Sequence, residues 1–435
     1  MSMSKDIQGL GLGLASRFAG SELAKKYGLR KPAERIAYLW TKKGFQFVGK
    51  LQADKAKKKA ADPLLLAAPA AHGLFDLTLT DEQQMIKDTV RSYAEEVVRG
   101  LAHDANEAMT LPENYLEDIQ ALGLNFFSVP EVLGGAAQSY SPTTSAIIAE
   151  ELAWGDMSLA FATLAPVGVA NAIVRWGTPK QKDTYLPNYL GEKPVKAAIA
   201  VQEPNALFDP KMLATKAKKT KRGFEISGVK TLLPFGGEAD LYLVAARYKK
   251  QPRLFFVRGD SEGVSWKAAP AMGLRATATG TLKLDSVHVD SDAMLGDDTF
   301  NYQSFIDLGQ LHWCALAIGA CQAALDYLIP YVNEREAFGE PISHRQSVAF
   351  MVANIGIEME SMRLMTWRAA ALAEMGKPFH REAYLAHVLC ADKAMEIGTN
   401  AVQLLGGHGF TKEHPAERWY RDLRVLACVN SGLHL

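Results

Sequence analysis

The sequence predicts a mostly helical α+β protein in which a small β-rich segment separates two helical ones. Long apolar stretches with helical spacing lie before residue 197 and after residue 299, and short β-rich runs lie between them. The 435 residues, 48% of them hydrophobic, suffice for two or three packed units. We therefore expect domains at 75–196, 197–299 and 300–435, after a basic extension and linker at 1–74.

The extension differs from the rest of the chain in charge. Residues 1–60 contain 14 Lys and Arg but only 4 Asp and Glu, in a chain whose formal net charge is +0. Aromatic residues stand among lysines in "AERIAYLWTKKGFQFVGKLQ", which suits an interfacial helix on anionic lipid or a docking arm. In the alternative interpretation the aromatics pack on the body and the lysines face water. Charge alone is no reason to expect nucleic-acid binding.

The first helical domain begins with an N-terminal capping signal. Thr80 is followed three residues later by Gln83, the pattern of a capping box, and Val90 and Tyr93 continue at roughly helical spacing. The segment 141–177 is apolar nearly all round, which predicts helices buried in the core.

Strands and bundle helices follow in turn. Four runs predict strands of the middle domain: "GFEISGVKTLLPF", "DLYLVAARY", "RLFFVRG" and "GTLKLDSVHVD". After residue 300, long apolar stretches starting near 305, 344 and 380 predict the helices of a bundle.

The cysteines and the apolar runs give no reason to expect a disulfide-rich, metal-binding or membrane-spanning protein. The four cysteines lack close pairing spacing, so we expect core packing and neither a disulfide framework nor a metal site. A reducing, cytoplasmic location fits this, with a peripheral membrane contact through residues 1–60 left open. No uninterrupted run of about 18 apolar residues is present, so we expect no membrane span.

Several motifs, in one order, carry a family resemblance. They are "EPNALFD" (203–209), "MGLRATATGTLKLDSVHV" (272–289), "REAFGEPISHRQ" (335–346), "QLLGGHGF" (403–410) and "EHPAERWYRD" (413–422). Together they resemble the acyl-CoA dehydrogenase family over residues 75–432. The resemblance implies an N-terminal helical domain, a small middle β domain and a C-terminal four-helix bundle.

The resemblance also implies a chemistry. Members of this family oxidise an acyl-CoA thioester between its α and β carbons: a glutamate removes the α proton and FAD takes the β hydride. The usual electron acceptor is an electron-transferring flavoprotein. One chain surrounds the flavin ring, and the neighbouring subunit of the oligomer holds the ADP end.

The residues that the family uses at the ADP end are all present. By resemblance, this group comprises Arg335, Phe338, Gln346, Gln403, Gly406 and Gly407. An arginine can pair with a phosphate in fork geometry, and glycines let the backbone approach a pyrophosphate closely. The alternative is a bundle arginine and a Gly-Gly pair that only ends a helix.

The ring side departs from the family pattern. Gln202 stands where the family has a Thr or Ser that bonds the flavin edge, and it can still donate to a ring edge. Phe208 replaces a serine. In the strand that flanks the ring, Leu232 replaces a Trp and Pro234 replaces a Thr, and a proline has neither hydroxyl nor backbone N–H.

Both positions at which this family places its catalytic carboxylate are empty. The usual one falls on Asn430, which is not basic, and the chain runs only five residues further, without the family's Gly-Thr and final helix. The second falls on Gly309. Asp307 lies two residues earlier, roughly 200° round a helix, so we expect it to face elsewhere as a charge near the helix N-terminus.

Three functions remain open on the sequence. The first is an ordinary FAD-dependent acyl-CoA dehydrogenase, a homo-oligomer with an unrecognised base that acts on an acyl-CoA or acyl-carrier thioester. The second is the base-lacking subunit of a mixed oligomer, whose ADP-side residues complete the site of an intact relative. The third is a silent scaffold, or an acyl-carrier or membrane-binding protein, that uses the same fold without flavin.

Overall fold

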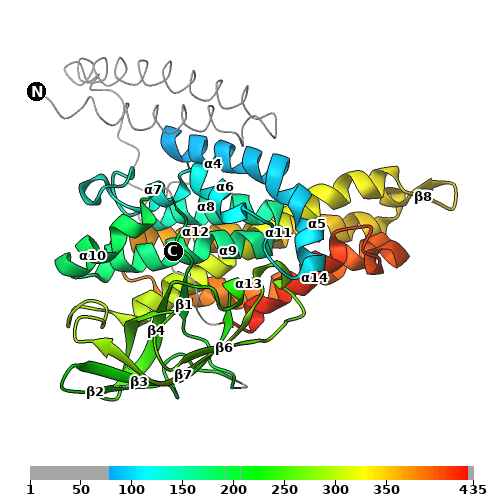
Figure 1. The fold of residues 1–435 in the computed structure, drawn as a ribbon. Helices are drawn as coiled ribbons and strands as arrows, with labels where there is room; N and C mark the ends of the chain where they lie inside the picture. The colour runs from blue at the N-terminus through cyan, green and yellow to red at the C-terminus, as the bar shows by residue number, and fades with distance from the viewer. Residues whose placement is uncertain (1–77, 192, 206, 430–435) are drawn as a thin grey trace, which may run out of the picture.

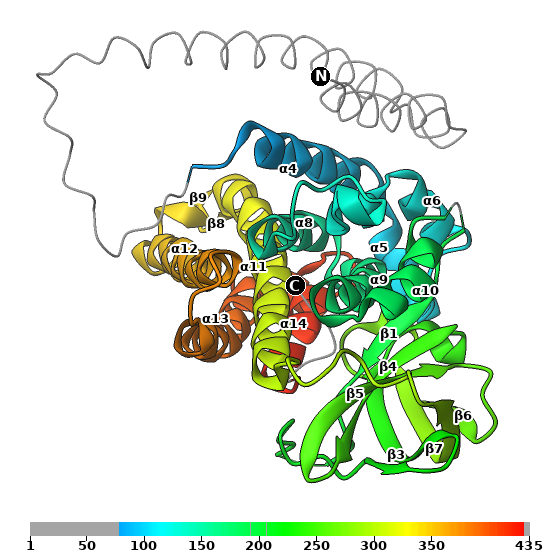
Figure 2. The same cartoon turned by 90° about the vertical axis from the view of Figure 1, so that its left-hand side faces the viewer.

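A computed structural model describes residues 78–429, except 192 and 206, and confirms the mostly helical α+β fold (Figure 1). The extension at 1–74 and Asn430 lie outside the described residues. A helical layer comes first in the chain, a twisted sheet follows, and three long helices pack beside both (Figure 2).

The N-terminal part is a group of helices around one buried pair. The helices are α4 (Asp81–Tyr93), α5 (Arg99–Ala108), α6 (Tyr115–Ala121), α7 (Leu124–Ser128), α8 (Pro142–Gly155), α9 (Met157–Trp176) and α10 (Pro179–Tyr189). The predicted capping box is confirmed, because the Thr80 hydroxyl accepts from Gln83 N and Gln83 Oε1 accepts from Thr80 N, both at 3.1 Å. The predicted burial of 141–177 is also confirmed, since α8 and α9 are buried along most of their length.

Two helices are long and apolar enough to cross a membrane by length and composition, although neither is an uninterrupted apolar run. One is α9, whose apolar window is 100% buried, and the other is α11 (Tyr302–Glu334), whose window is 61% buried. Both pack within the protein as core helices, which explains their composition.

The middle part is a seven-stranded sheet. Its strands are β1 (Ala197–Ala200), β2 (Lys216–Lys219), β3 (Gly223–Leu233), β4 (Leu241–Tyr248), β5 (Gln251–Arg258), β6 (Val264–Ala268) and β7 (Gly280–Asp290). The order is β1-β4-β2-β3-β7-β6, and β5 also pairs with β4. The four predicted strands are confirmed as β3, β4, β5 and β7. The ladder of β3 with β7 shifts register between Lys230 and Leu233, directly beside the helical part.

The C-terminal part is built on α11, which packs against α8, α13 (His380–Leu405) and α12 (Gln346–Glu374). A two-stranded hairpin of β8 (Glu336–Ala337) and β9 (Glu340–Pro341) joins α11 to α12. The short α14 (Ala416–Leu423) follows α13. Figure 1 shows the hairpin projecting from one end of these helices, away from the sheet.

Buried charges join α14 to the sheet. Asp422 Oδ1 accepts a hydrogen bond from Leu274 N at 2.7 Å, and Arg418 pairs with Asp156, the residue before α9, at 3.1 Å. Burial, together with the nearby Asp156 carboxylate, raises the pKa of Asp422 to about 7. These contacts fix the loop that carries Leu274 against the helices.

Candidate functional site

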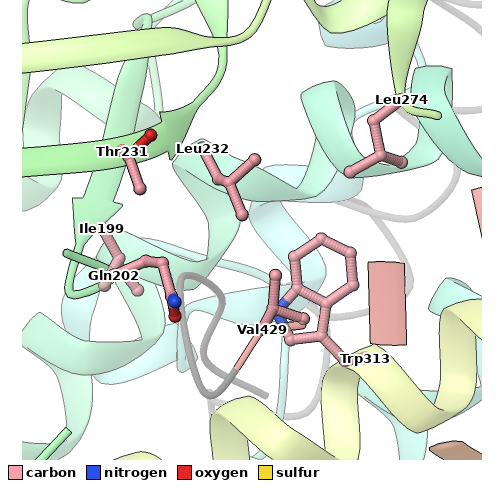
Figure 3. A pocket seen from close by; sticks show the side chains of 7 residues that line it. All are labelled: Ile199, Gln202, Thr231, Leu232, Leu274, Trp313 and Val429. Carbon is pink, nitrogen blue, oxygen red and sulfur yellow. The ribbon is translucent and has the colours of Figure 1, made fainter. Parts of the chain in front are cut away.

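A small cavity lies where the sheet meets α11. It is lined by Ile199, Gln202, Thr231, Leu232, Leu274, Trp313 and Val429 (Figure 3). Leu232 from the sheet and Trp313 from α11 reach it from opposite sides. The free space is about 10 Å³, room for about one water molecule.

A buried ion pair shapes the sheet side of this cavity. Lys230 is fully buried, and its Nζ donates to Val201 O at 3.0 Å and to Glu203 Oε1 at 2.9 Å. Burial lowers the pKa of Lys230 to about 8, although the Glu203 carboxylate opposes the shift. Because both partners flank Gln202, and Thr231 N donates to Gln202 O at 3.0 Å, the backbone around Gln202 is held firmly.

The backbone turns Leu232 toward the helices. Leu232 has a φ of +56°, in the left-handed region, at the point where the β3 ladder shifts register. Pro234, which follows the strand, is buried. The leucine therefore stands at the cavity because of a strained strand end.

Trp313 fills most of the space on the helix side. Its side chain is 2% exposed, and its ring packs on that of Phe161 with 4.9 Å between the centroids. Neither Trp313 Nε1 nor Gln202 Oε1 has a hydrogen-bond partner among the described residues. A buried hydrogen-bond donor and a buried hydrogen-bond acceptor thus line one cavity, and both favour the binding of a small polar ligand.

The space between Leu232 and Trp313 is narrow in this structure. Pockets for ligands of cofactor size are roughly 300–1,000 Å³, well above the space between Leu232 and Trp313. Phe208, another departure from the family pattern, packs on the core beside the sheet. Gln202 is the one predicted cofactor contact that lies at the cavity.

The six residues predicted for the ADP end lie at the opposite end of α11. Arg335 ends the helix, Phe338 is at the hairpin tip, and Gln346 begins α12. Gln403 lies in the last turn of α13, with Gly406 and Gly407 just after it. Tyr331 Oη donates to Leu405 O at 3.4 Å, so the two groups belong to one end of the bundle.

All six are exposed, and Phe338 is exposed to 95%. Its φ of +59° places the ring outward, and the Arg345 guanidinium lies 5.5 Å from the ring centroid. We call these six residues the bundle-end surface. Exposed arginine, amides and flexible glycine backbone fit a phosphate-bearing group presented from outside.

Exposed apolar side chains also follow the two outer helices. On α12, Phe350, Ile357 and Leu364 recur every seven residues and are 59%, 63% and 43% exposed. On α13, Tyr384 and Val388 are 56% and 48% exposed. We call these five residues the apolar stripe, and they have the spacing of a helix face that packs on another helix.

Comparison with known families explains the shared architecture. Models described as the N-terminal, middle and C-terminal domains of acyl-CoA dehydrogenase match residues 80–193, 198–287 and 301–430. The chain belongs to the acyl-CoA dehydrogenase family.

Individual relatives agree with this assignment. The chain is 31% identical over 361 residues to the short-chain specific acyl-CoA dehydrogenase of Bos taurus mitochondria, covering 80% of this chain and 86% of the relative. It is 28% identical to the butyryl-CoA dehydrogenase of Megasphaera elsdenii, with a TM-score of 0.75 and coverage of 82% and 96%. A chain from a structure of the electron transferring flavoprotein of Acidaminococcus fermentans is also 28% identical, with a TM-score of 0.76 and coverage of 82% and 96%.

The assignment of the two base positions to Asn430 and Gly309 stays a prediction from the resemblance. Asn430 lies just beyond the described residues, and it follows Val429 in the sequence. Gly309 is buried within α11. Asp307 is not at the cavity: it is buried, and accepts from Gln303 Nε2 at 2.8 Å and His380 Nδ1 at 2.9 Å. Burial raises the pKa of Asp307, partly offset by His380.

Trp313 is a residue at the cavity that sequence reasoning missed. It stands four residues after Gly309, hence on the same face of α11 one turn later. That spacing was a usable signal, because it places an indole beside the second base position. Glu417 and Arg418, by contrast, form the expected ion pairs, with Arg421 at 2.6 Å and Asp156 at 3.1 Å.

Proposed function

We propose that this chain is a subunit of a FAD-dependent acyl-CoA dehydrogenase that works as a mixed oligomer. In this proposal the bundle-end surface holds the ADP end of an FAD whose ring lies in a related chain with the catalytic glutamate. The FAD supplies the redox chemistry when it is bound. The curated relatives are named as acyl-CoA dehydrogenases, which supports an acyl-CoA or acyl-carrier thioester as the substrate of the assembled complex.

The observation that carries the proposal is the contrast between the two ends of α11. At the Trp313 end the chain leaves space for about one water, whereas at the Arg335 end every residue suited to the pyrophosphate is present and exposed. If the chain had lost its function without selection for binding a partner's flavin, the residues at the Arg335 end would have no reason to persist while the Trp313 end was filled.

The distance between the ends supports a shared site. Trp313 and Arg335 are 22 residues apart on one helix, which corresponds to about 33 Å at a rise of 1.5 Å per residue. In the proposal the bundle-end surface therefore serves a flavin whose ring lies in another chain.

The apolar stripe supports association between chains. Five large apolar side chains, exposed on neighbouring helices, are costly in water and favour burial against another subunit. In the proposal a chain of the same family covers them, and the complex passes electrons to an electron-transferring flavoprotein in the cytoplasm, with residues 1–60 at the membrane surface.

Native mass spectrometry of the complex purified from its own cells tests the proposal. We expect a mixed oligomer with one FAD per pair of unlike chains. A homo-oligomer with one FAD per chain would instead indicate an ordinary dehydrogenase with an unidentified base. A chain without flavin in every complex would favour the scaffold.

A further inference from the structure

A cluster of metal-binding side chains lies in the turn between α13 and α14, outside the cavity and unused by the proposed function. His408, Glu413 and His414 each place one potential ligand atom within 4.8 Å of the other two. The imidazole centroids of the two histidines are 5.4 Å apart, with the rings tilted by 76°. In Figure 1 this turn lies at the end of the bundle that carries β8.

The backbone under His408 is held by close packing. A Cβ on the next residue, Gly409, would come within 2.2 Å of Val402 O, so only glycine lets the turn rest directly on α13. Thr411 donates to His408 O from both N, at 3.1 Å, and Oγ1, at 2.9 Å. The position of His408 is therefore set by the fold.

His414 is oriented by an aromatic pair on α11. Tyr327 Oη lies 2.6 Å from His414 Nδ1, and the rings of Tyr327 and Tyr331 meet the imidazole edge-on, with centroids 6.0 Å and 5.8 Å away. With a metal on Nε2, the Nδ1 proton donates to Tyr327 Oη. Histidines that bind metals typically have such a partner on the second nitrogen, which fixes the tautomer.

We propose that His408, Glu413 and His414 bind one divalent transition-metal ion, with Zn²⁺ the best match. Two imidazoles and a carboxylate form a known zinc ligand set, whereas Mg²⁺ and Ca²⁺ prefer oxygen ligands alone. Tetrahedral ligands at 2.0–2.1 Å from zinc stand about 3.3 Å apart. Glu413 is exposed and can rotate to close the set around the ion. The ion would link the two ends of the turn between Gly407 and the start of α14.

A second His–Glu pair on the surface serves as a control for nonspecific metal binding. His344 Nδ1 and Glu340 Oε2 lie 3.3 Å apart at the same end of the bundle, and both side chains are exposed. Within the part of the chain that the structure describes, no third metal-binding side chain completes a group of three with this pair. A merely opportunistic surface site would form there as readily as at His414.

Zn²⁺ titration of the full-length chain without a histidine tag, followed by competition with a chromophoric chelator, tests the site. We expect one equivalent of Zn²⁺ to bind with a Kd of about 1 µM or below. Loss of an outer-shell partner of a metal ligand already costs roughly 10- to 100-fold in affinity. Glu413→Gln and His408→Ala each remove a direct ligand and should weaken binding by at least as much. His344→Gln and Cys428→Ser should leave the affinity unchanged.

Thermal unfolding completes the test, because it separates loss of the site from loss of the fold. Without metal, Glu413→Gln should melt with the wild type, and Zn²⁺ should raise the Tm of the wild type but not that of this variant. Equal affinities in all four variants, or no uptake by the wild type at about 100 µM Zn²⁺, would overturn the proposal. Neither result depends on flavin or on a partner chain.

Discussion

The cavity beside Trp313 and the bundle-end surface around Arg335 belong to the same helix but differ in burial and chemistry. The cavity is lined by an indole and a leucine, and the Gln202 amide oxygen and the indole N–H have no hydrogen-bond partner among the described residues. The bundle-end surface is open and offers an arginine, two amides and glycine backbone. The comparison teaches that one helix can carry a closed, apolar environment near one end and an open, polar one at the other, and the proposed function assigns the ring side of a cofactor site to the first and its ADP side to the second.

The largest expected effect is a loss of stability when the Trp313 side chain is removed from beside the cavity. Trp313→Ala should lower the free energy of unfolding by about 3–5 kcal/mol, because a large buried ring is removed and the cavity only partly collapses. Chemical denaturation measures the loss. Indole added to the variant should restore part of the Tm by refilling the space, and a loss below about 1 kcal/mol would mean that Trp313 does not fill the site.

At the open region the expected effect is on binding. Arg335→Ala should weaken FAD retention by the mixed complex about 10- to 100-fold, since a charge-assisted bond to phosphate is worth about 1.5–3 kcal/mol. Flavin fluorescence after gel filtration provides the measurement. Arg381→Ala, which changes another exposed arginine of the bundle, is the matched control. Equal flavin loss in both variants would show that Arg335 does not hold FAD in particular, which contradicts the role proposed for the bundle-end surface.

A smaller effect is expected on the pH dependence of stability, through the buried Asp422 that holds the Leu274 loop at the cavity. The Asp422 carboxyl has a pKa of about 7 in the folded state against 3.8 ordinarily, so folding takes up a proton between these values. The stability that this proton contributes is full below the ordinary pKa and is lost as pH rises through 7, with about 1 kcal/mol of the loss between pH 6 and pH 8. Asp422→Asn, which can still accept from Leu274 N, should flatten this pH dependence of the Tm. An unchanged slope would show that Asp422 does not titrate there.

The smallest expected effect is none at all. Asn430→Glu should give no acyl-CoA oxidation by the chain alone, because Leu232, Pro234 and Phe208 still depart from the family pattern on the ring side and the cavity beside Leu232 stays narrow. Dye reduction with short-chain acyl-CoA substrates measures this, with a catalytically intact relative as positive control. Turnover by the single variant would contradict the closed cavity.

Local sequence was a good guide wherever local physics decides. Thr80 and Gln83 predicted a helix start because a capping box involves only neighbouring residues. The strands β3, β4, β5 and β7 were evident from β-branched and aromatic runs. By contrast, β1 (Ala197–Ala200) and β2 (Lys216–Lys219) gave no such signal, since β1 becomes a strand by pairing with β4 and β2 by pairing mainly with β3.

The sequence by itself determined the family and the presence of the bundle-end residues, and it predicted a missing carboxylate at Gly309, because each depends on residue identity and spacing. Only the tertiary structure decided that Trp313 and Leu232 meet across one cavity and that the six bundle-end residues share an exposed surface. These residues come from segments far apart in the chain, and packing of β3, α11 and α13 brings them together. Space and exposure are properties of that packing, so no local pattern could encode them.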